Sequence, residues 1–355
     1  MNRTLFVCMS LFAFSSLSAR EIPRTEKTEE EVVFCNKPQG VTLAGTLSLP
    51  YKGFRGRTVV LVSGSGPQDR NEEVFGHKPF QVLADYLVEA GIGVLRYDDR
   101  GIGGSTGSFE SATTYDFSLD AESAMEYLHG RKFKQVGMAG HSEGGAIVSM
   151  VAARNPDVAF LVLLAAPGIR GDSLLLLQQE AIARKAGLPE QVIRFQREAN
   201  RRVFALLSGN PSPQDSRDTL IYVIRQIMGS DFPEEPFEDE RMERQVEWQM
   251  ERCMSPWMLY FLGFSPDSCL RTVQCPVLAL NGGEDLQVLP EPNLEALSGA
   301  LKAGGNRQVE TEIMPGLNHL FQQCRTCTIN EYAALEEAMN GRVLERVARW
   351  IHSLK

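Results

Sequence analysis

The sequence predicts an α/β fold: a mostly parallel sheet flanked by helices, with a helical insertion. Three observations lead to this prediction. Continuous apolar runs such as Thr58–Val62 have the β-branched composition of strands buried on both faces. Helical stretches separate these runs, an alternation that is typical of parallel sheets. A hydrophobic content of 43% over 355 residues allows a large core, with either an insertion or a second domain.

The first elements are expected to form an antiparallel hairpin. Val32–Cys35 and Val41–Pro50 alternate between apolar and polar residues, with a turn at Lys37–Gly40. This period of two indicates strands with one exposed face. The polar segment Arg20–Glu31 that precedes them is expected to be flexible.

Four strand–helix units are expected to follow the hairpin. The expected strands are Thr58–Val62, Ile92–Tyr97, Lys134–Ala139 and Val158–Ala166. Helices are expected after the first three strands, at Pro79–Ala90, Tyr115–Gly130 and Ala146–Arg154. Near the C-terminus we expect strands at Cys275–Asp285 and Gln308–Met314, and helices near Pro292–Gly299 and at Gly341–Leu354. This order implies helices on both faces of one sheet.

Residues 169–268 lack strand patterns and are interpreted as a helical cap over the active edge of the sheet. Its helices are expected at Leu174–Gly187, Pro189–Ser208, Asp215–Met228 and Phe237–Met254. The core domain then comprises residues 20–168 and 269–355. Large apolar residues of the cap either line a substrate pocket or pack the cap against the core: Met242, Trp248, Met250, Met254, Trp257, Met258, Tyr260 and Phe261.

Residues 1–19 have the features of a signal peptide. Arg3 carries a positive charge, Leu5–Phe14 is an apolar run, and small residues lead to a cleavage position after Ala19. The apolar run is too short for a stable membrane span. We therefore expect the chain to be exported, to a periplasm or out of the cell, after this segment is removed.

Six cysteines follow the leader, an even number that makes disulfides plausible in an oxidising compartment. They are Cys35, Cys253, Cys269, Cys275, Cys324 and Cys327. The C-x-x-C pair Cys324 and Cys327 is the most apparent candidate, but the sequence does not choose among the pairings. A metal site is disfavoured because there is no second C-x-x-C.

Charge and loop spacing argue against two classes of partner. The formal net charge of −9 disfavours nucleic acid, which needs a basic face. The glycine-rich turn Asp98–Gly107 does not have G-x-G-x-x-G spacing and precedes a polar loop. We therefore predict neither a nucleotide cofactor nor a metal, and the sequence leaves the oligomeric state open.

The strongest functional signal is the pattern G-x-S-x-G at Gly140, Ser142 and Gly144. An expected strand precedes it and an expected apolar helix follows it, which is the context of a nucleophile elbow. Glycines flank the serine because side chains there would collide with the strand or the helix, and the turn strains its serine. The alternative is a serine that merely caps the helix.

A serine nucleophile needs a base within hydrogen-bond reach, and His319 is the best candidate. It follows the last strand, from where a loop can reach the elbow. His129 and His352 lie near surface turns, and His77 precedes a helix. His141 is next to the serine, where its side chain is expected to point away from Ser142.

The acid that orients the base is expected after the preceding strand. Asp285 is preferred over its neighbour Glu284, because the shorter carboxylate lies further into the turn. The resulting chain order of serine, aspartate and histidine differs from that of chymotrypsin and subtilisin.

Two backbone N–H groups are expected to bind the developing oxyanion. One belongs to Glu143, the residue after the nucleophile. The other is expected from the glycine-containing loop after Thr58–Val62, and we favour Ser65 there.

Five segments together resemble the α/β-hydrolase superfamily, in its serine-aminopeptidase-like and esterase branch. They are Gly64–Asn71, Tyr97–Ser105, Gly140–Gly145, Asp285–Val288 and Gly316–Phe321. Each is weak alone, but their common order is specific, and the resemblance covers roughly residues 32–352, least in the cap. It implies an α/β-hydrolase fold and acyl-enzyme hydrolysis of carboxylic esters, often short-chain or aryl esters.

Two other functions stay open. An aminopeptidase or amidase on the same fold needs a carboxylate for the substrate amine, and the cap offers Glu234, Glu235, Glu238, Asp239 and Glu240. A non-catalytic binding protein is the third possibility, since fold does not determine function. A small-molecule ester remains the expected substrate.

Overall fold

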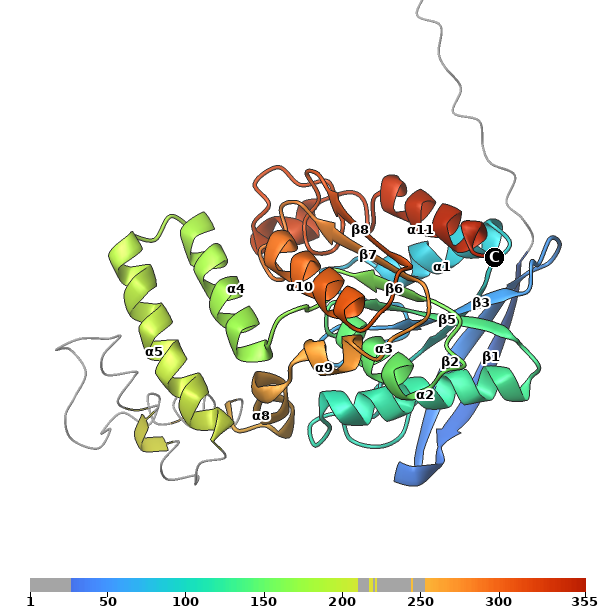
Figure 1. Ribbon diagram of the computed structural model, residues 1–355, viewed down its shortest axis with the longest axis horizontal. Coiled ribbons are helices and arrows are strands. Elements are labelled where there is room, and N and C mark those ends of the chain that lie inside the picture. The colour runs from blue at the N-terminus through green and yellow to red at the C-terminus, as the bar shows by residue number, and fades with distance from the viewer. Residues whose placement is uncertain (1–26, 210–216, 220, 222–243, 245–252) are drawn as a thin grey trace, which may run out of the picture.

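The computed structural model describes residues 27–209, 217–219, 221, 244 and 253–355. Among these, eight strands form one sheet in the order β1-β2-β4-β3-β5-β6-β7-β8 (Figure 1). The strands are β1 (Lys27–Asn36), β2 (Val41–Pro50), β3 (Arg57–Val62), β4 (Gly93–Tyr97), β5 (Gln135–His141), β6 (Leu161–Leu164), β7 (Val277–Gly282) and β8 (Val309–Met314). β2 runs antiparallel to both neighbours, and the pairs from β4 to β8 are parallel. The mostly parallel sheet predicted from the sequence is confirmed.

The helices follow the predicted alternation with small shifts at their ends. Those of the core are α1 (Pro79–Glu89), α2 (Thr114–Gly130), α3 (Glu143–Arg154), α10 (Pro290–Ala303) and α11 (Gly341–Ser353). Between β6 and β7 lie α4 (Gly171–Lys185), α5 (Glu190–Ser208), α8 (Pro256–Gly263) and α9 (Pro266–Leu270). Short 3-10 helices occur at Lys37–Gln39 and Ile329–Ala334.

The N-terminal hairpin begins earlier than predicted. The segment expected to be flexible is strand from Lys27 onward, and Glu31 pairs with Thr46 of β2. An edge strand needs backbone partners on one side only, so its charged side chains can remain near solvent. Several of them form ion pairs, among them Lys27 with Asp85 at 2.5 Å and Glu31 with Arg70 at 2.5 Å. The polar composition hid the strand because these partners are distant in sequence.

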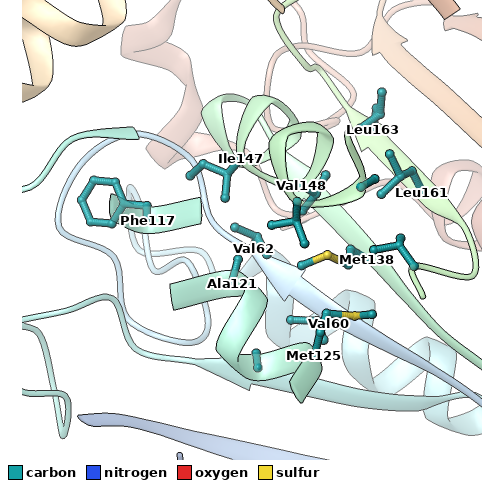
Figure 2. Packing of buried hydrophobic residues seen from close by; sticks show 14 of the residues in the cluster. Val60, Val62, Phe117, Ala121, Met125, Met138, Ile147, Val148, Leu161 and Leu163 are labelled. Carbon is teal, nitrogen blue, oxygen red and sulfur yellow. The ribbon is translucent and has the colours of Figure 1, made fainter. Parts of the chain in front are cut away.

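Two apolar layers enclose the sheet, one on each face. Val60 and Val62 of β3 face a layer that includes α2 and α3 (Figure 2). Residues of α10 belong to the same layer. Val59 and Leu61 of the same strand face the layer formed by α1 and α11. Successive side chains of a strand point to opposite faces, so a strand between two layers must be apolar at every position. This explains the continuous apolar run from which β3 was predicted.

The segment between β6 and β7 is helical where it is described. Figure 1 shows α4 and α5 as a pair of helices beside the sheet. They pack on α8 through a small apolar cluster that includes Phe204, Leu207 and Leu262. Leu174, Phe261 and Val288 form a second cluster, between these helices and the loop after β7.

Several sequence-based expectations lie outside the described residues. These are the leader 1–19, most of the expected helices Asp215–Met228 and Phe237–Met254, and Met242, Trp248 and Met250. The helix α9 crosses the expected boundary at residue 268. No helix in the described ranges combines the length and apolarity needed to cross a membrane.

Candidate active site

Ser142 lies in the sharp turn between β5 and α3, with φ 52° and ψ −124°. Its backbone N–H donates to the carbonyl oxygen of Leu164 over 2.8 Å, which holds this turn against β6. A positive φ is uncommon for a residue with a side chain and is typical of strained functional positions. The hydroxyl makes no capping hydrogen bond to α3, so the alternative of a simple helix cap finds no support.

The glycines around Ser142 are there because the turn leaves no space for side chains. A Cβ atom at Gly140 would lie 2.1 Å from the carbonyl oxygen of Gly144. A Cβ at Gly144 would lie 2.1 Å from the carbonyl oxygen of Val62, so α3 begins in direct contact with β3. These distances confirm the steric reason for the G-x-S-x-G pattern.

His319 and Asp285 meet as the sequence predicted. Nδ1 of His319 lies 2.8 Å from Oδ2 of Asp285, and the two residues are 5% and 2% exposed. The other carboxylate oxygen accepts the N–H groups of Gln287 (2.8 Å) and Val288 (2.9 Å). Because the carboxylate is an acceptor, the neutral tautomer that this contact favours has its proton on Nδ1, so that Nε2 can act as the acceptor.

The other candidates for base and acid have different partners. Nε2 of His77 contacts the carbonyl oxygen of Tyr332, at 3.0 Å, and Nε2 of His352 contacts that of Ala90, at 2.8 Å. The carboxylate of Glu284 lies 3.9 Å from the Lys185 ammonium. The choice of Asp285 over Glu284 therefore agrees with the geometry.

Ser142 and His319 line one cavity of about 230 Å³, which also reaches Ser65 and Glu143. Its apolar wall consists of Val74, Phe75, Leu174, Leu175, Trp257, Phe261, Val288 and Leu320. Ser142 and His319 are not hydrogen-bonded to each other here, as is frequent in sites without substrate. Of the apolar residues expected to line a pocket, Trp257 and Phe261 line this cavity and Tyr260 does not. Met254 and Met258 line a neighbouring groove and also pack against the cluster around Phe204.

Two backbone N–H groups remain available beside the nucleophile. A Cβ at Gly64 would lie 3.0 Å from Cβ of Ser142, so the loop after β3 passes close to the serine. The N–H of Gly64 donates to Oε1 of Glu72 over 2.8 Å. Within the described ranges, the N–H groups of Ser65 and Glu143 donate to no other protein atom. These are the two groups predicted from the sequence.

Glu72 and His141 form a buried pair that the sequence analysis missed. Nδ1 of His141 lies 2.9 Å from Oε1 of Glu72, and Nε2 lies 3.0 Å from the carbonyl oxygen of His319. Burial alone lowers the pKa of His141, but the charge and hydrogen bond of Glu72 outweigh it and raise that pKa above 6.5. No local pattern marks Glu72, which is 69 residues away from its partner.

Buried carboxylates join the loops that follow β3 and β4. These loops contain Gly64–Asn71 and Tyr97–Ser105, two of the five segments that resemble the α/β-hydrolase superfamily. Asp98 accepts from Nε (3.0 Å) and Nη2 (2.8 Å) of Arg70. Asp99 accepts from the Ser63 hydroxyl (3.0 Å) and the Gln68 N–H (3.1 Å). The glycine-rich turn thus supports the loop that contains Ser65.

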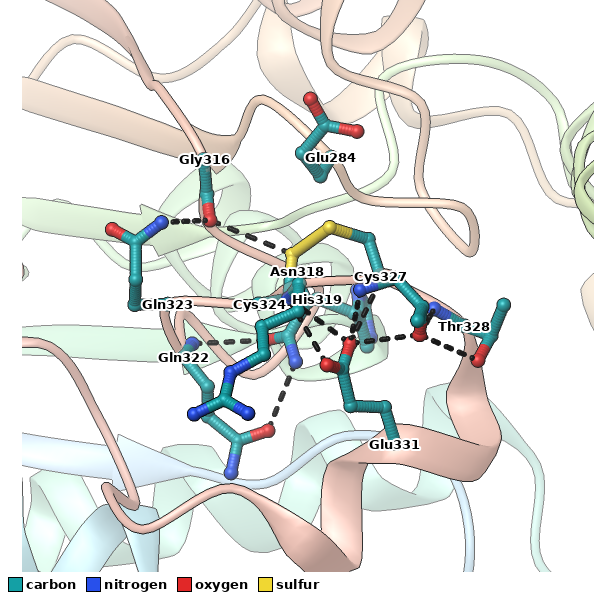
Figure 3. The surroundings of a disulfide bond; sticks show 12 residues. Glu284, Gly316, Asn318, His319, Gln322, Gln323, Cys324, Cys327, Thr328 and Glu331 are labelled. Atoms are coloured by element: carbon teal, nitrogen blue, oxygen red, sulfur yellow. Dashed lines mark hydrogen bonds between the residues drawn. A yellow bond between two sulfur atoms is a disulfide. The ribbon is translucent and has the colours of Figure 1, made fainter.

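A disulfide joins Cys324 and Cys327, with Cα atoms 4.9 Å apart, in the segment after β8 (Figure 3). The expectation of a disulfide among the six cysteines is confirmed for this pair. Glu331 holds the same segment by accepting the N–H groups of Arg325 (3.1 Å), Thr326 (2.9 Å) and Cys327 (2.7 Å).

Cys35, Cys269 and Cys275 are free thiols. Burial raises the pKa of Cys275 to about 12, which makes it an inert apolar side chain. Among the residues that the structure describes, no group of three or more His, Cys, Asp or Glu side chains is arranged to hold a metal ion.

Comparisons with known proteins agree with this fold. A sequence model of the serine aminopeptidase S33 family matches residues 77–221, a segment that contains Ser142 but neither Asp285 nor His319. The chain is also 26% identical over 313 residues to Esterase EstD from Thermotoga maritima. That match covers 87% of this chain, which spans 65% of the length of the relative.

Solved structures share the architecture. The esterase Pf2001 of Pyrococcus furiosus superposes with a TM-score of 0.54 at 15% identity, over 92% of this chain and 91% of that one. A proline iminopeptidase from Mycobacterium smegmatis gives a TM-score of 0.54 at 17% identity, over 91% and 98% of the two chains. At such identities the likeness concerns the fold.

The fold is therefore that of the α/β hydrolases. In sequence the chain is similar to the serine aminopeptidase S33 family and to an esterase, the branch that its motifs resemble.

Proposed function

We propose that this chain is an exported serine hydrolase that cleaves carboxylic esters through an acyl-enzyme on Ser142. The observation that carries the proposal is the buried hydrogen bond between His319 and Asp285, in a site whose cavity also contains a serine at positive φ. A surface histidine or a helix-capping serine has no need of this arrangement. Similarity to a protein named an esterase supports the same reaction.

In the proposed reaction, Oγ of Ser142 attacks the ester carbonyl carbon while Nε2 of His319 takes the hydroxyl proton. Asp285 holds the Nδ1–H of His319 and stabilises the imidazolium that forms. The C–O bond of the tetrahedral intermediate breaks, and the alcohol leaves with the proton from Nε2. Water then attacks the acyl carbon with His319 as base, which releases the acid and restores Ser142.

The oxyanion of each tetrahedral intermediate is proposed to accept from the N–H groups of Ser65 and Glu143. Both groups border the cavity with Ser142 and lack a protein acceptor among the described residues. Donors that are already in place stabilise developing charge without reorganisation, and removing one typically costs about 10²–10³ in kcat. This chemistry requires no cofactor.

The size of the cavity favours a short acyl group. About 230 Å³ between Leu174, Phe261 and Val288 leaves little space beyond the reacting ester. The apolar wall favours a hydrocarbon or a small aryl group over a charged group.

Hydrolysis of p-nitrophenyl esters from acetate to decanoate by the mature protein tests the proposal. We expect activity that peaks at short chains, disappears in Ser142→Ala and survives in Ser173→Ala, an exposed serine of α4. Equal activity of wild type and Ser142→Ala would overturn the role of Ser142. Peak activity at decanoate would overturn the short-chain specificity.

An aminopeptidase or amidase remains the alternative on the same fold, and the family model bears the name of a serine aminopeptidase. The carboxylates that the sequence analysis considered for a substrate amine, Glu234, Glu235, Glu238, Asp239 and Glu240, lie outside the described residues. Comparing an acyl ester with an aminoacyl anilide separates the two reactions. A non-catalytic binding protein would not be labelled at Ser142 by a fluorophosphonate.

Export is the second part of the proposal. A signal peptide ending at Ala19 and a disulfide between Cys324 and Cys327 both fit an oxidising compartment outside the cytoplasm. N-terminal sequencing of the protein recovered from an exporting host tests this. We expect the mature chain to begin at Arg20, and an uncleaved Met1 in the cytoplasmic fraction would contradict it.

A further inference from the structure

The side chain of Glu143 is an unusual feature of the elbow. The residue follows the nucleophile directly, yet it is only 2% exposed and its carboxylate has three side-chain donors. Burying a carboxylate costs free energy unless hydrogen bonds compensate for the lost water. Burial raises the pKa of Glu143, and the three donors oppose this rise.

The three donors come from separate parts of the molecule. The hydroxyl of Ser65, in the loop after β3, donates to Oε2 over 2.6 Å. The hydroxyl of Thr114, at the start of α2, donates to Oε1 over 2.7 Å. Nε1 of Trp257, in α8, donates to the same oxygen over 2.7 Å. One carboxylate thus links a helix between β6 and β7 to two elements of the core.

The contact with Ser65 bears on the proposed oxyanion site. A hydrogen bond to the hydroxyl of Ser65 restrains that residue, and its N–H is one of the two proposed oxyanion donors. Restraint matters because a displacement of about 1 Å in such a group can cost 10²-fold in rate. The backbone of Glu143 provides the other donor, so this residue acts on both.

The contact with Trp257 connects the same carboxylate to the cavity of Ser142 and to a neighbouring groove. Trp257 lines the cavity of Ser142, and it also lines a second groove of about 940 Å³. Ser65 borders both spaces as well. The indole of Trp257 stacks on Phe261, in the same helix, with 5.1 Å between the ring centroids, so the indole moves with α8. Displacement of α8 therefore acts on Glu143 through a single hydrogen bond.

We propose that Glu143 is a positioning residue that couples the docking of α8 to the direction of the Ser65 N–H. Transition-state stabilisation then depends on Trp257 being in place. This inference rests on the proposed hydrolase function, and it assigns to the position after the nucleophile a role for its side chain in addition to its N–H.

A double-mutant cycle between Trp257→Phe and Glu143→Ala tests the coupling. Trp257→Phe keeps an aromatic ring and removes the Nε1 donor, and Glu143→Ala removes the shared acceptor. We expect kcat for p-nitrophenyl acetate to fall about tenfold in Trp257→Phe and about 100-fold in Glu143→Ala. KM should stay within about threefold of the wild-type value in both variants. In the Glu143→Ala background, Trp257→Phe should cause no further loss, since the link is already broken.

Glu143→Gln is the conservative comparison. Its amide oxygen can accept from Thr114 and Trp257, and its NH₂ can donate to the Ser65 hydroxyl, which turns to accept. We therefore expect this variant to recover most of the kcat lost in Glu143→Ala. Tyr260→Phe is the control on α8, because Tyr260 lies in the same helix without a hydrogen bond to Glu143, and its kcat should equal that of wild type.

The rate of inactivation by a fluorophosphonate is measured on the same variants, so that no ester needs to be assumed. A wild-type protein that does not react would overturn the proposed function and this inference together. If the wild type reacts, two outcomes would overturn the inference alone. In one, the losses of the two single variants multiply in the double variant; in the other, the variants change only in melting temperature or KM. If Glu143→Ala does not fold, a cycle between Trp257→Phe and Ser65→Ala replaces it. We expect the two losses to be non-additive, and additive losses would contradict the coupling.

Discussion

Nε2 of His141 lies 3.0 Å from the carbonyl oxygen of His319 and donates to it, so the residue before the nucleophile holds the backbone of the proposed base. The other nitrogen of His141 faces Oε1 of Glu72 at 2.9 Å. Both nitrogens thus face oxygen atoms, an arrangement that an imidazolium satisfies with two donors. A hydrogen bond thus joins the elbow to the loop after β8, and a buried ion pair joins it to the loop after β3.

This pair predicts a pH dependence of stability. The folded pKa of His141 is raised above 6.5, because Glu72 outweighs the effect of burial. A raised folded pKa contributes stability that is fully present below about pH 6.5 and is lost as pH rises through the folded pKa. We expect the melting temperature of wild type to exceed that of Glu72→Gln most at about pH 6, with the difference shrinking toward about pH 9.

Glu73→Gln provides the control for that experiment. Glu73 is the exposed neighbour of Glu72 and forms an ion pair with Lys78 at 3.2 Å, in which both side chains are about half exposed. Its removal should change the melting temperature little at any pH in this range. A wild-type advantage over Glu72→Gln that stays constant from about pH 6 to about pH 9 would contradict the proposed ion pair.

Replacing Asp285 should separate orientation of the base from folding. In Asp285→Asn the amide can donate to Nδ1 of His319, which favours the wrong tautomer. We expect kcat on short esters to fall by about 10⁴-fold while the melting temperature changes modestly. Glu284→Gln, next to it in the same turn, should retain kcat within about twofold, because the one ion pair of Glu284 among the described residues is a partly exposed one with Lys185. Equal losses in the two variants would argue against Asp285.

Gly144→Ala should destabilise the protein as well as abolish activity. The added Cβ would lie 2.1 Å from the Val62 carbonyl oxygen, and backbone on both sides cannot yield without separating α3 from β3. A cost above about 3 kcal/mol is expected, measured by denaturant unfolding or as loss of soluble protein. Gly130→Ala is the matched control, since no atom lies within 4 Å of its Cβ position, and it should be neutral or stabilising. Comparable unfolding free energies for the two variants would refute the steric argument.

Leu174→Ala should lengthen the acyl chains that the cavity accepts. Leu174 lines the cavity with Ser142, and truncation removes side-chain atoms from its apolar wall. We expect the ratio of kcat/KM for octanoate over acetate to rise about tenfold, since single methylenes in apolar pockets contribute at that scale. Leu176→Ala is the control, because Leu176 packs against the cluster around Phe204 and does not line this cavity. The same shift in both variants would show a general loosening instead.

Much of this protein could be predicted from local pattern. A run such as Val59–Val62 must be buried on both faces, and G-x-S-x-G around Ser142 requires a turn without flanking side chains. The contact between Asp285 and His319 was predictable because parallel strands bring the loops at their carboxyl ends to one edge of the sheet. Periodicity, turn chemistry and chain order are all readable along the chain.

The partners of buried polar side chains were decided only by tertiary structure. Glu72 contacts His141, and Glu143 contacts Trp257, across 69 and 114 residues. No spacing rule relates such residues, because their contact depends on how separate layers pack. The sequence thus determined which residues lie at the edge of the sheet, and the fold decided which of them hold one another in place, since a buried charge must find its hydrogen bonds wherever packing brings donors near.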